Sequence, residues 1–253
     1  CHTLLAHALG GGQVRQTYAN TLEALEESYR AGIRYFEVDV DVTCDGRMVL
    51  SHGWSERACE KTGMQYQPEF EQMTLAMFRQ QTIRSMHTMD IRDLQQYMDA
   101  HPDTCFEIDF HRTGVADKVK VLLQEFSGRE DLYERLLIQA GDQKIFGRID
   151  RQYHFRHYQM ILRPEWQNHL ENGVFVFVLE HGIQTIAVRH ALFQDFYVRL
   201  FHAAGLSIMV YTIQDDAKRA AELLNMGVDT VCTDFVTPKE LREAGCREER
   251  GSL

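Results

Sequence analysis

The chain has 253 residues, of which 44% are hydrophobic and 25% charged, a balance typical of a globular protein with a sizeable core. Its formal net charge of −10 argues against a nucleic-acid partner, which would require a basic face. No apolar run reaches the length of about eighteen residues that a membrane span needs, so we expect no transmembrane segment in this chain.

Along the chain, short β-rich runs alternate with amphipathic stretches of helical period. The expected strands cover residues 3–7, 34–40, 104–110, 135–140, 157–163, 182–188, 207–213 and 230–234. The expected helices cover residues 20–32, 90–100, 115–126, 190–205, 215–227 and 237–245. The first helix is expected to begin at a capping Asn20 or Thr21 and to end at Gly32.

A short apolar run over residues 48–52 follows the Cys44-Asp45-Gly46 turn. Residues 53–88 lack a clean period, and we expect them to form an excursion over the mouth of the domain, inserted after the second strand.

The alternation of strands and helices with short connections implies right-handed crossovers and a parallel sheet. A parallel α/β chain of this length most often closes into a (β/α)₈ TIM barrel, and we expect one such domain over residues 1–253. An open, doubly wound sheet is the alternative.

The six cysteines are scattered and contain no C-x-x-C pair, so no disulfide framework is indicated. Cys105 and Cys232 fall in strand-like runs and are expected to be buried thiols. The chain opens at Cys1, without an initiator Met or a signal segment, and is interpreted as a trimmed product. Its compartment therefore stays open: cytoplasmic, or exported or anchored through a removed upstream segment.

Polar side chains fall where strands end, which is where parallel barrels carry their active groups. Glu37 and Asp39 lie two apart on the second strand, so both point to the same side. The candidates at strand ends are His7, Glu37, Asp39, His52, Glu107 and Asp109. Crowded carboxylates repel one another unless a cation lies between them, and an oxygen-rich set suits Mg²⁺ or Ca²⁺.

Less specific interpretations compete with this one. A single histidine near a strand end is more often structural than catalytic. A Glu-x-Asp pair also fits a solvated strand face, with Phe36, Val38 and Val40 on the buried side. The chain contains no G-x-G-x-x-G, no G-x-x-x-x-G-K-[ST] and no G-x-S-x-G, which disfavours nucleotide-cradling loops and the serine-hydrolase elbow.

The opening stretch, residues 6–54, is similar to the signature of glycerophosphodiester phosphodiesterases. That signature has a histidine after the first strand, an E-N-T-like helix start, an E-x-D pair, a T-x-D-G turn and a second histidine. Residues 205–238 resemble the last two strand–helix units of the same family, whereas residues 53–183 diverge.

The resemblance implies His7 and His52 as an acid–base pair. It also implies Glu37 and Asp39 as ligands of a divalent metal, Mg²⁺ or Ca²⁺, with Glu107 as the third carboxylate. The candidate substrate-binding residues are Asn20, Trp54, Asp109, Gln139 and Tyr211.

The chain also departs from the family pattern. Ala8 replaces an arginine, Ala19 replaces the glutamate of E-N-T, and Asp109 stands where a lysine is expected. Two phosphate-facing cations are thus missing. Asp109 could enlarge the metal site, and Arg112 or Lys144 could restore the charge, although a surface role is the simpler interpretation for each basic residue.

We therefore expect a metal-dependent phosphoric diester hydrolase that cleaves glycerophosphodiesters to glycerol phosphate and an alcohol. The alternatives are a phospholipase D-like or C-like lyase of the same barrel, acting on lysophospholipids, and an inactive binding barrel. The expected partner is a small-molecule or lysolipid phosphodiester, as in lipid metabolism. A sugar isomerase would need more histidines at strand ends than this chain offers.

Overall fold

The computed structural model describes residues 4–110, 113–163 and 174–247. Its strands are β1 (Leu4–Ala6), β2 (Tyr35–Val42), β3 (Met48–Leu50), β4 (Thr82–Ile83), β5 (Met86–His87), β6 (Cys105–Asp109), β7 (Leu136–Ala140), β8 (Tyr158–Leu162), β9 (Thr185–Arg189), β10 (Ser207–Ile213) and β11 (Thr230–Thr233). Its α-helices are α1 (Leu22–Arg30), α2 (Glu56–Thr62), α3 (Leu75–Arg79), α4 (Ile91–Ala100), α5 (Val115–Glu125), α6 (Gln143–Asp150), α8 (Phe175–Glu180), α9 (Phe196–Ala203), α10 (Ala217–Asn225) and α11 (Pro238–Glu243).

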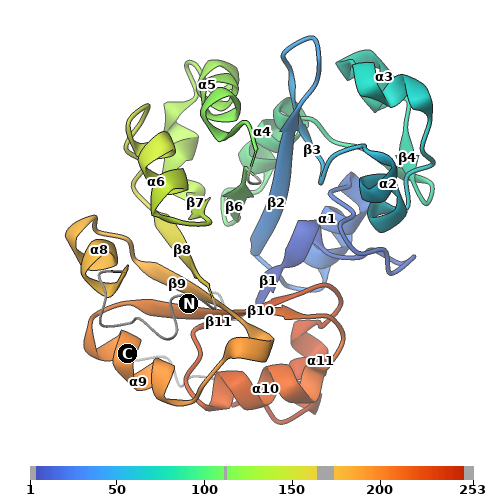
Figure 1. Ribbon diagram of the computed structural model, residues 1–253. Helices are drawn as coiled ribbons and strands as arrows, with labels where there is room; N and C mark the ends of the chain where they lie inside the picture. The colour runs from blue at the N-terminus through green and yellow to red at the C-terminus, as the bar shows by residue number, and fades with distance from the viewer. Residues whose placement is uncertain (1–3, 111–112, 164–173, 248–253) are drawn as a thin grey trace.

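Eight parallel strands form a closed barrel, which confirms the expected TIM-barrel fold. Their order is β1-β11-β10-β9-β8-β7-β6-β2, and the pairing of β1 with β2 closes the ring. Helices lie outside this ring in Figure 1. The carboxyl ends of all eight strands therefore meet at one rim, where barrel enzymes bind their ligands.

The run after the Asp45-Gly46 turn is not a barrel strand. β3 pairs antiparallel with the carboxyl-terminal end of β2, with Val40 opposite Leu50. The two strands form a hairpin that continues beyond the rim of the barrel. Residues 53–88 then form α2, α3, the short β4–β5 hairpin and a 3₁₀ turn over Pro68–Gln72. These elements lie together beside β3 in Figure 1, at the end of β2 that carries the rim.

Local sequence signals explain most helix boundaries. α4 and α11 begin with capping boxes, Asp90 with Asp93 and Thr237 with Glu240. The helix expected over residues 190–205 is instead interrupted: a 3₁₀ turn ends at Leu192, and α9 begins at Phe196. Phe193 between them has extended backbone and packs against the core, which favours the break.

The core has two parts. The larger part lies between the strands and the surrounding helices. A small apolar cluster, of which Leu5, Ala187, Met209 and Cys232 are the buried members, marks the inner face of the barrel. Above this cluster the inner face is polar.

A cavity of about 290 Å³ opens at the amino ends of the strands, opposite the rim, and Tyr35, Cys105 and Gln159 help to line it. Cys232 is buried as expected, whereas Cys105 is only half-buried because it lines this cavity. Both are free thiols. We expect no active site at this cavity, because TIM-barrel enzymes carry their catalytic groups at the carboxyl ends of the strands.

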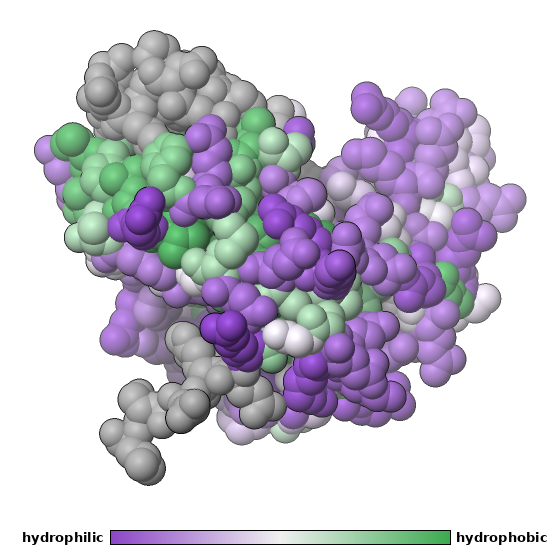
Figure 2. All heavy atoms as spheres, turned by 90° about the horizontal axis from the view of Figure 1, so that it is seen from below, coloured by the Kyte–Doolittle hydropathy of each residue, from purple (hydrophilic) through white to green (hydrophobic). Residues whose placement is uncertain are grey.

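Apolar side chains gather on one part of the surface in Figure 2, on an otherwise polar face. The exposed large hydrophobic side chains of α8 and α9 are Val176, Leu179 and Phe196. None of the helices in the described ranges combines the length and the apolarity that crossing a bilayer would require.

Candidate active site

His7 lies directly after β1 and is oriented by a carboxylate. Its Nδ1 lies 2.7 Å from Oδ1 of Asp234, which follows β11, the neighbouring strand. Its Nε2 lies 4.0 Å from Oε2 of Glu37. Burial lowers the pKa of His7, but the hydrogen bond and charge of Asp234, with the charges of Asp39 and Asp109, outweigh it and raise the pKa. The geometry favours an imidazolium whose Nε2 faces the carboxylates.

The loop after His7 binds two of the predicted metal ligands. Ala8 has left-handed backbone, with φ of 47°, and its N–H donates to Oε2 of Glu37 at 2.7 Å. Asn20 also has φ of 47°, a conformation that asparagine tolerates better than most residues. The Asn20 amide donates to Oδ2 of Asp39 and accepts from the Asp39 N–H. The N-cap of α1 is Thr21, the other residue that the sequence indicated, although its side chain makes no capping hydrogen bond.

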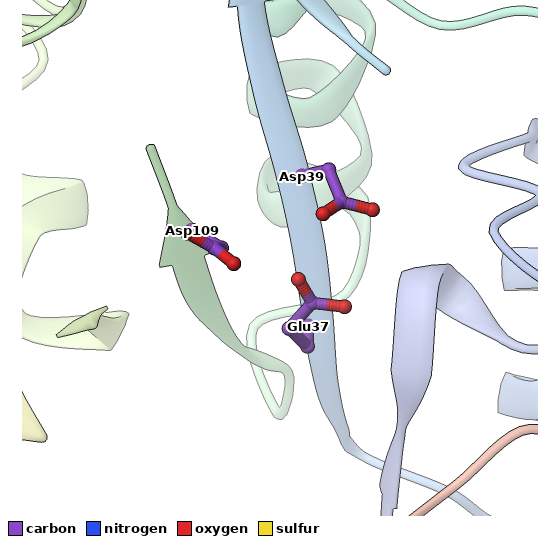
Figure 3. Close-up of side chains that lie close together, drawn as sticks. All are labelled: Glu37, Asp39 and Asp109. Carbon is purple, nitrogen blue, oxygen red and sulfur yellow. The ribbon is translucent and has the colours of Figure 1, made fainter. Parts of the chain in front are cut away.

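Three carboxylates meet inside the rim. The parallel register of β2 and β6 places Asp39 beside Asp109 and Glu37 beside Glu107. Oxygens of Glu37, Asp39 and Asp109 all lie within 4.8 Å of one another. Figure 3 shows the Asp109 carboxylate directed from β6 toward the two acids of β2. The group found in the described ranges thus contains Asp109, the position where the family pattern has lysine, rather than Glu107.

The electrostatics of this group fit a bound cation. Burial, followed by the charges of Asp39 and Asp109, raises the pKa of Glu37 well above its usual range, although the Ala8 N–H opposes the rise. A divalent cation would relieve exactly this repulsion, and an all-oxygen donor set suits Mg²⁺ or Ca²⁺. The residues present therefore fit a metal.

Glu107 lies one inward-facing position below Asp109. Its Oε1 accepts a hydrogen bond of 2.6 Å from Nε2 of Gln159, while Oε2 is buried without a hydrogen-bond partner in the described part of the chain. Burial, then the charge of Asp109, raises the pKa of Glu107 to about 8, and the bond from Gln159 opposes the rise. This raised pKa favours the neutral form of Glu107 when no metal is bound.

This shift predicts how the stability of the metal-free protein depends on pH. Folded Glu107 keeps a proton up to about pH 8, whereas the unfolded chain loses it near 4.5, so the folded state binds more protons between these values. The free energy of unfolding should therefore fall as pH rises from 5 to 8, by a few kcal/mol, since one pKa unit corresponds to about 1.4 kcal/mol. Urea titrations in chelator measure this, and Glu107→Gln should flatten the slope. Parallel slopes for the two proteins would exclude this role of Glu107.

His52 follows the β3 extension and faces the same region. The Tyr18 ring packs edge-on against His7 at 4.9 Å and against His52 at 4.5 Å between centroids. One phenol ring thus separates the two imidazoles. Trp54 is half-buried, and its ring centroid lies 6.5 Å from that of Phe78 of α3. Trp54 therefore packs within the segment of residues 53–88, two positions after His52.

A buried lysine clamps the two ligand-bearing strands. Lys118 of α5 donates to the main-chain oxygens of Val40 at 3.3 Å and Phe110 at 3.0 Å. Its Nζ also lies 3.1 Å from Oδ1 of Asp41. Val40 and Phe110 directly follow Asp39 and Asp109, which pair in register, so Lys118 braces the two strands just beyond these carboxylates.

Gln139 and Tyr211 lie further around the inner face. Gln139 is half-buried and accepts a 3.4 Å hydrogen bond from Gln159. Tyr211 packs against the inner apolar cluster. Arg112 lies outside the described residues, and Lys144 is exposed on α6.

The sequence interpretation missed Asp234, Tyr18 and Lys118. Asp234 could have been found, because it ends a predicted strand as the other acids do. Tyr18 and Lys118 carry no such signal, since a loop tyrosine and a helical lysine are ordinary surface residues until the fold places them.

An acidic group and two imidazoles lie at the rim, where TIM-barrel enzymes carry their catalytic groups, and comparison with known families gives the reaction class. Residues 10–237 match the model of the glycerophosphoryl diester phosphodiesterase family. The chain belongs to this family and is a phosphoric diester hydrolase. No curated protein sequence gives a match.

Solved structures support the fold. A Silicibacter pomeroyi protein described as a glycerophosphoryl diester phosphodiesterase has a TM-score of 0.76 at 18% identity, covering 96% of this chain and 92% of its own. A phosphodiesterase of Oleispira antarctica, in complex with the product sn-glycerol-3-phosphate, has a TM-score of 0.74 at 18% identity, covering 96% of both chains. A Parabacteroides distasonis glycerophosphodiester phosphodiesterase has a TM-score of 0.72 at 18% identity, with 96% coverage of both chains.

Proposed function

We propose that this chain hydrolyses glycerophosphodiesters to glycerol phosphate and an alcohol, with a divalent metal at Glu37, Asp39 and Asp109. The observation that carries the proposal is the close approach of these three carboxylates beside the His7–Asp234 pair. The family match supports the reaction class, and the similar Oleispira antarctica phosphodiesterase holds sn-glycerol-3-phosphate. Glu107, implied as a ligand by the family resemblance, stays a prediction.

When bound, the cation would neutralise phosphate charge and stabilise the negative charge that develops on the phosphate oxygens. Asn20 holds Asp39 in place for this purpose, and the Ala8 N–H holds Glu37. Lys118 braces the two strands that carry Asp39 and Asp109.

The two histidines would transfer the protons. His52 takes a proton from the attacking water, whose oxygen forms the new bond to phosphorus. His7, kept protonated by Asp234, donates a proton from Nε2 to the alcohol oxygen as its bond to phosphorus breaks. Asp234 orients His7 and stabilises its positive charge, as carboxylates do for catalytic imidazoles.

Metal dependence tests the proposal. EDTA should abolish release of sn-glycerol 3-phosphate from glycerophosphodiesters, and Mg²⁺ or Ca²⁺ should restore it. Chromatography of the products separates glycerol phosphate from the cyclic phosphate that a lyase would leave. EDTA saturated beforehand with Ca²⁺ is the matched control and should leave activity intact.

Full turnover in chelator would refute the metal site. Cyclic phosphate as the product would favour a lyase, and metal binding without turnover on any diester would favour an inactive binding barrel.

A further inference from the structure

Two arginines stand side by side at the rim, on neighbouring strands. Arg189 is the last residue of β9, and Arg163 directly follows β8. The register of these strands pairs Leu162 with Val188, so the arginines occupy the next pair of positions.

Alternation along the strands places both arginines on the inner face. Ala187, two residues before Arg189, belongs to the small cluster inside the barrel. Ile161, two residues before Arg163, packs against the same cluster. Val188, between Ala187 and Arg189, belongs to the outer core. Because side chains two apart share a face, Arg163 and Arg189 project into the mouth.

The surroundings of Arg163 are fitted to it. Its Nε donates to the Gly141 oxygen at 2.6 Å. A Cβ added at Gly141 would lie 3.0 Å from Nη2 of Arg163, so a glycine there leaves room for the guanidinium. Arg189 is exposed and pairs in register with Tyr211 of β10. Burial raises the pKa of Tyr211, the charges of Arg189 and Arg163 oppose the rise, and Asp109 adds to it, so the phenol lies in the fields of both groups.

The arginines lie across the mouth from the catalytic groups. In the closed ring, three strands separate β8 from β1 in either direction, and three separate β9 from β2. His7 follows β1, and β2 carries Glu37 and Asp39, so the rim has an acidic side. Opposite it lies the side of the two arginines, the basic side, where Nη2 of Arg163 also lies 3.9 Å from Oδ2 of Asp142.

We propose that Arg163 and Arg189 bind a second negative charge, on the alcohol portion of the substrate, and that the enzyme prefers diesters whose alcohol carries a carboxylate or a phosphate. This inference rests on the proposed function. With the reacting phosphate at the acidic side, the alcohol extends across the mouth toward the guanidinium groups. Guanidinium pairs bidentately with carboxylate and phosphate, whereas it repels the ammonium of a choline-like alcohol.

Two diesters that differ by one carboxylate test the proposal. Glycerophosphoserine carries this group and glycerophosphoethanolamine does not. We expect kcat/KM to be higher for the serine diester by about tenfold or more, as for a charge-assisted hydrogen bond. Arg163→Gln and Arg189→Gln should each bring the ratio of the two kcat/KM values toward one, mainly by raising KM for the serine diester. Arg199→Gln, on exposed α9 surface, is the matched control and should keep the wild-type ratio.

A wild-type ratio near one would overturn the proposal. An equal loss on both diesters in the arginine variants would also overturn it, because the arginines would then bind the reacting phosphate. Arg189 is exposed, so Arg189→Gln provides the test even if Arg163→Gln fails to fold. If wild-type enzyme with metal cleaves neither diester, it is the proposed function that fails.

Discussion

Alanine in place of His7 is expected to lower kcat by about 10²-fold or more, because the variant lacks the group that protonates the leaving alcohol. His52→Ala should cost a similar factor through loss of the proton acceptor. Initial rates on the best glycerophosphodiester measure both effects. The double variant should be little worse than either single variant, because groups that act as one unit are not additive.

Metal content and thermal stability serve as the controls for these variants, and both should stay close to wild type. The wild-type pH–rate profile should be bell-shaped, with one limb from each imidazole. The hydrogen bond and charge of Asp234 raise the pKa of His7, so the limb that His7 sets should give an apparent pKa above the ordinary histidine pKa of 6.5. Near-normal kcat in either single variant would make that histidine structural.

The second large effect concerns the metal. Glu37→Gln should reduce metal affinity by more than the roughly 10–100-fold that loss of a supporting hydrogen-bond partner typically costs. The reason is that Glu37 contributes one of the three carboxylates of the close group, while the next acid on β2, Asp41, is paired with Lys118. Isothermal titration with Mg²⁺ and with Ca²⁺ measures the affinity directly, without an activity assay.

Asp109→Asn and Glu107→Gln form a matched pair for the third ligand. If the geometry of the metal-free site persists, Asp109→Asn should weaken metal binding strongly, and Glu107→Gln should weaken it less, because Glu107 is engaged by Gln159. The reverse order would restore Glu107 to the ligand set that the family resemblance implies.

The fold was predictable from the sequence because its signals are local. Apolar runs, helical spacing and terminal glycines mark most of the strand–helix units, and a parallel sheet of eight strands has few ways to close. The helices α6 and α8 were not predicted. The run at residues 48–52 shows the limit of such signals. Whether a short apolar strand joins the barrel or folds back on β2 depends on its partner, which the sequence does not name.

The acidic side of the site was predictable for the same reason, since Glu37, Asp39 and Asp109 alternate along strands. Whether Glu107 or Asp109 is the third carboxylate of the group could not be predicted. Both side chains face inward, and their height along the barrel axis depends on the stagger between strands, which the sequence does not give. The basic side was missed. Arg163 and Arg189 lie at strand ends, but a terminal arginine also fits a solvated end, and only the pairing of β8 with β9 shows that the two are neighbours.

The Lys118 clamp bears on ion size. Calcium accepts six to eight oxygens at about 2.3–2.6 Å in flexible arrangements, whereas magnesium requires a near-octahedral shell at about 2.0–2.1 Å. Lys118 donates to the next main-chain oxygen after Asp39 and after Asp109, so it adds a second connection between two strands that already pair at this height. We therefore predict that a shorter or longer side chain at position 118 changes the ratio of the Mg²⁺ and Ca²⁺ affinities, which isothermal titration measures.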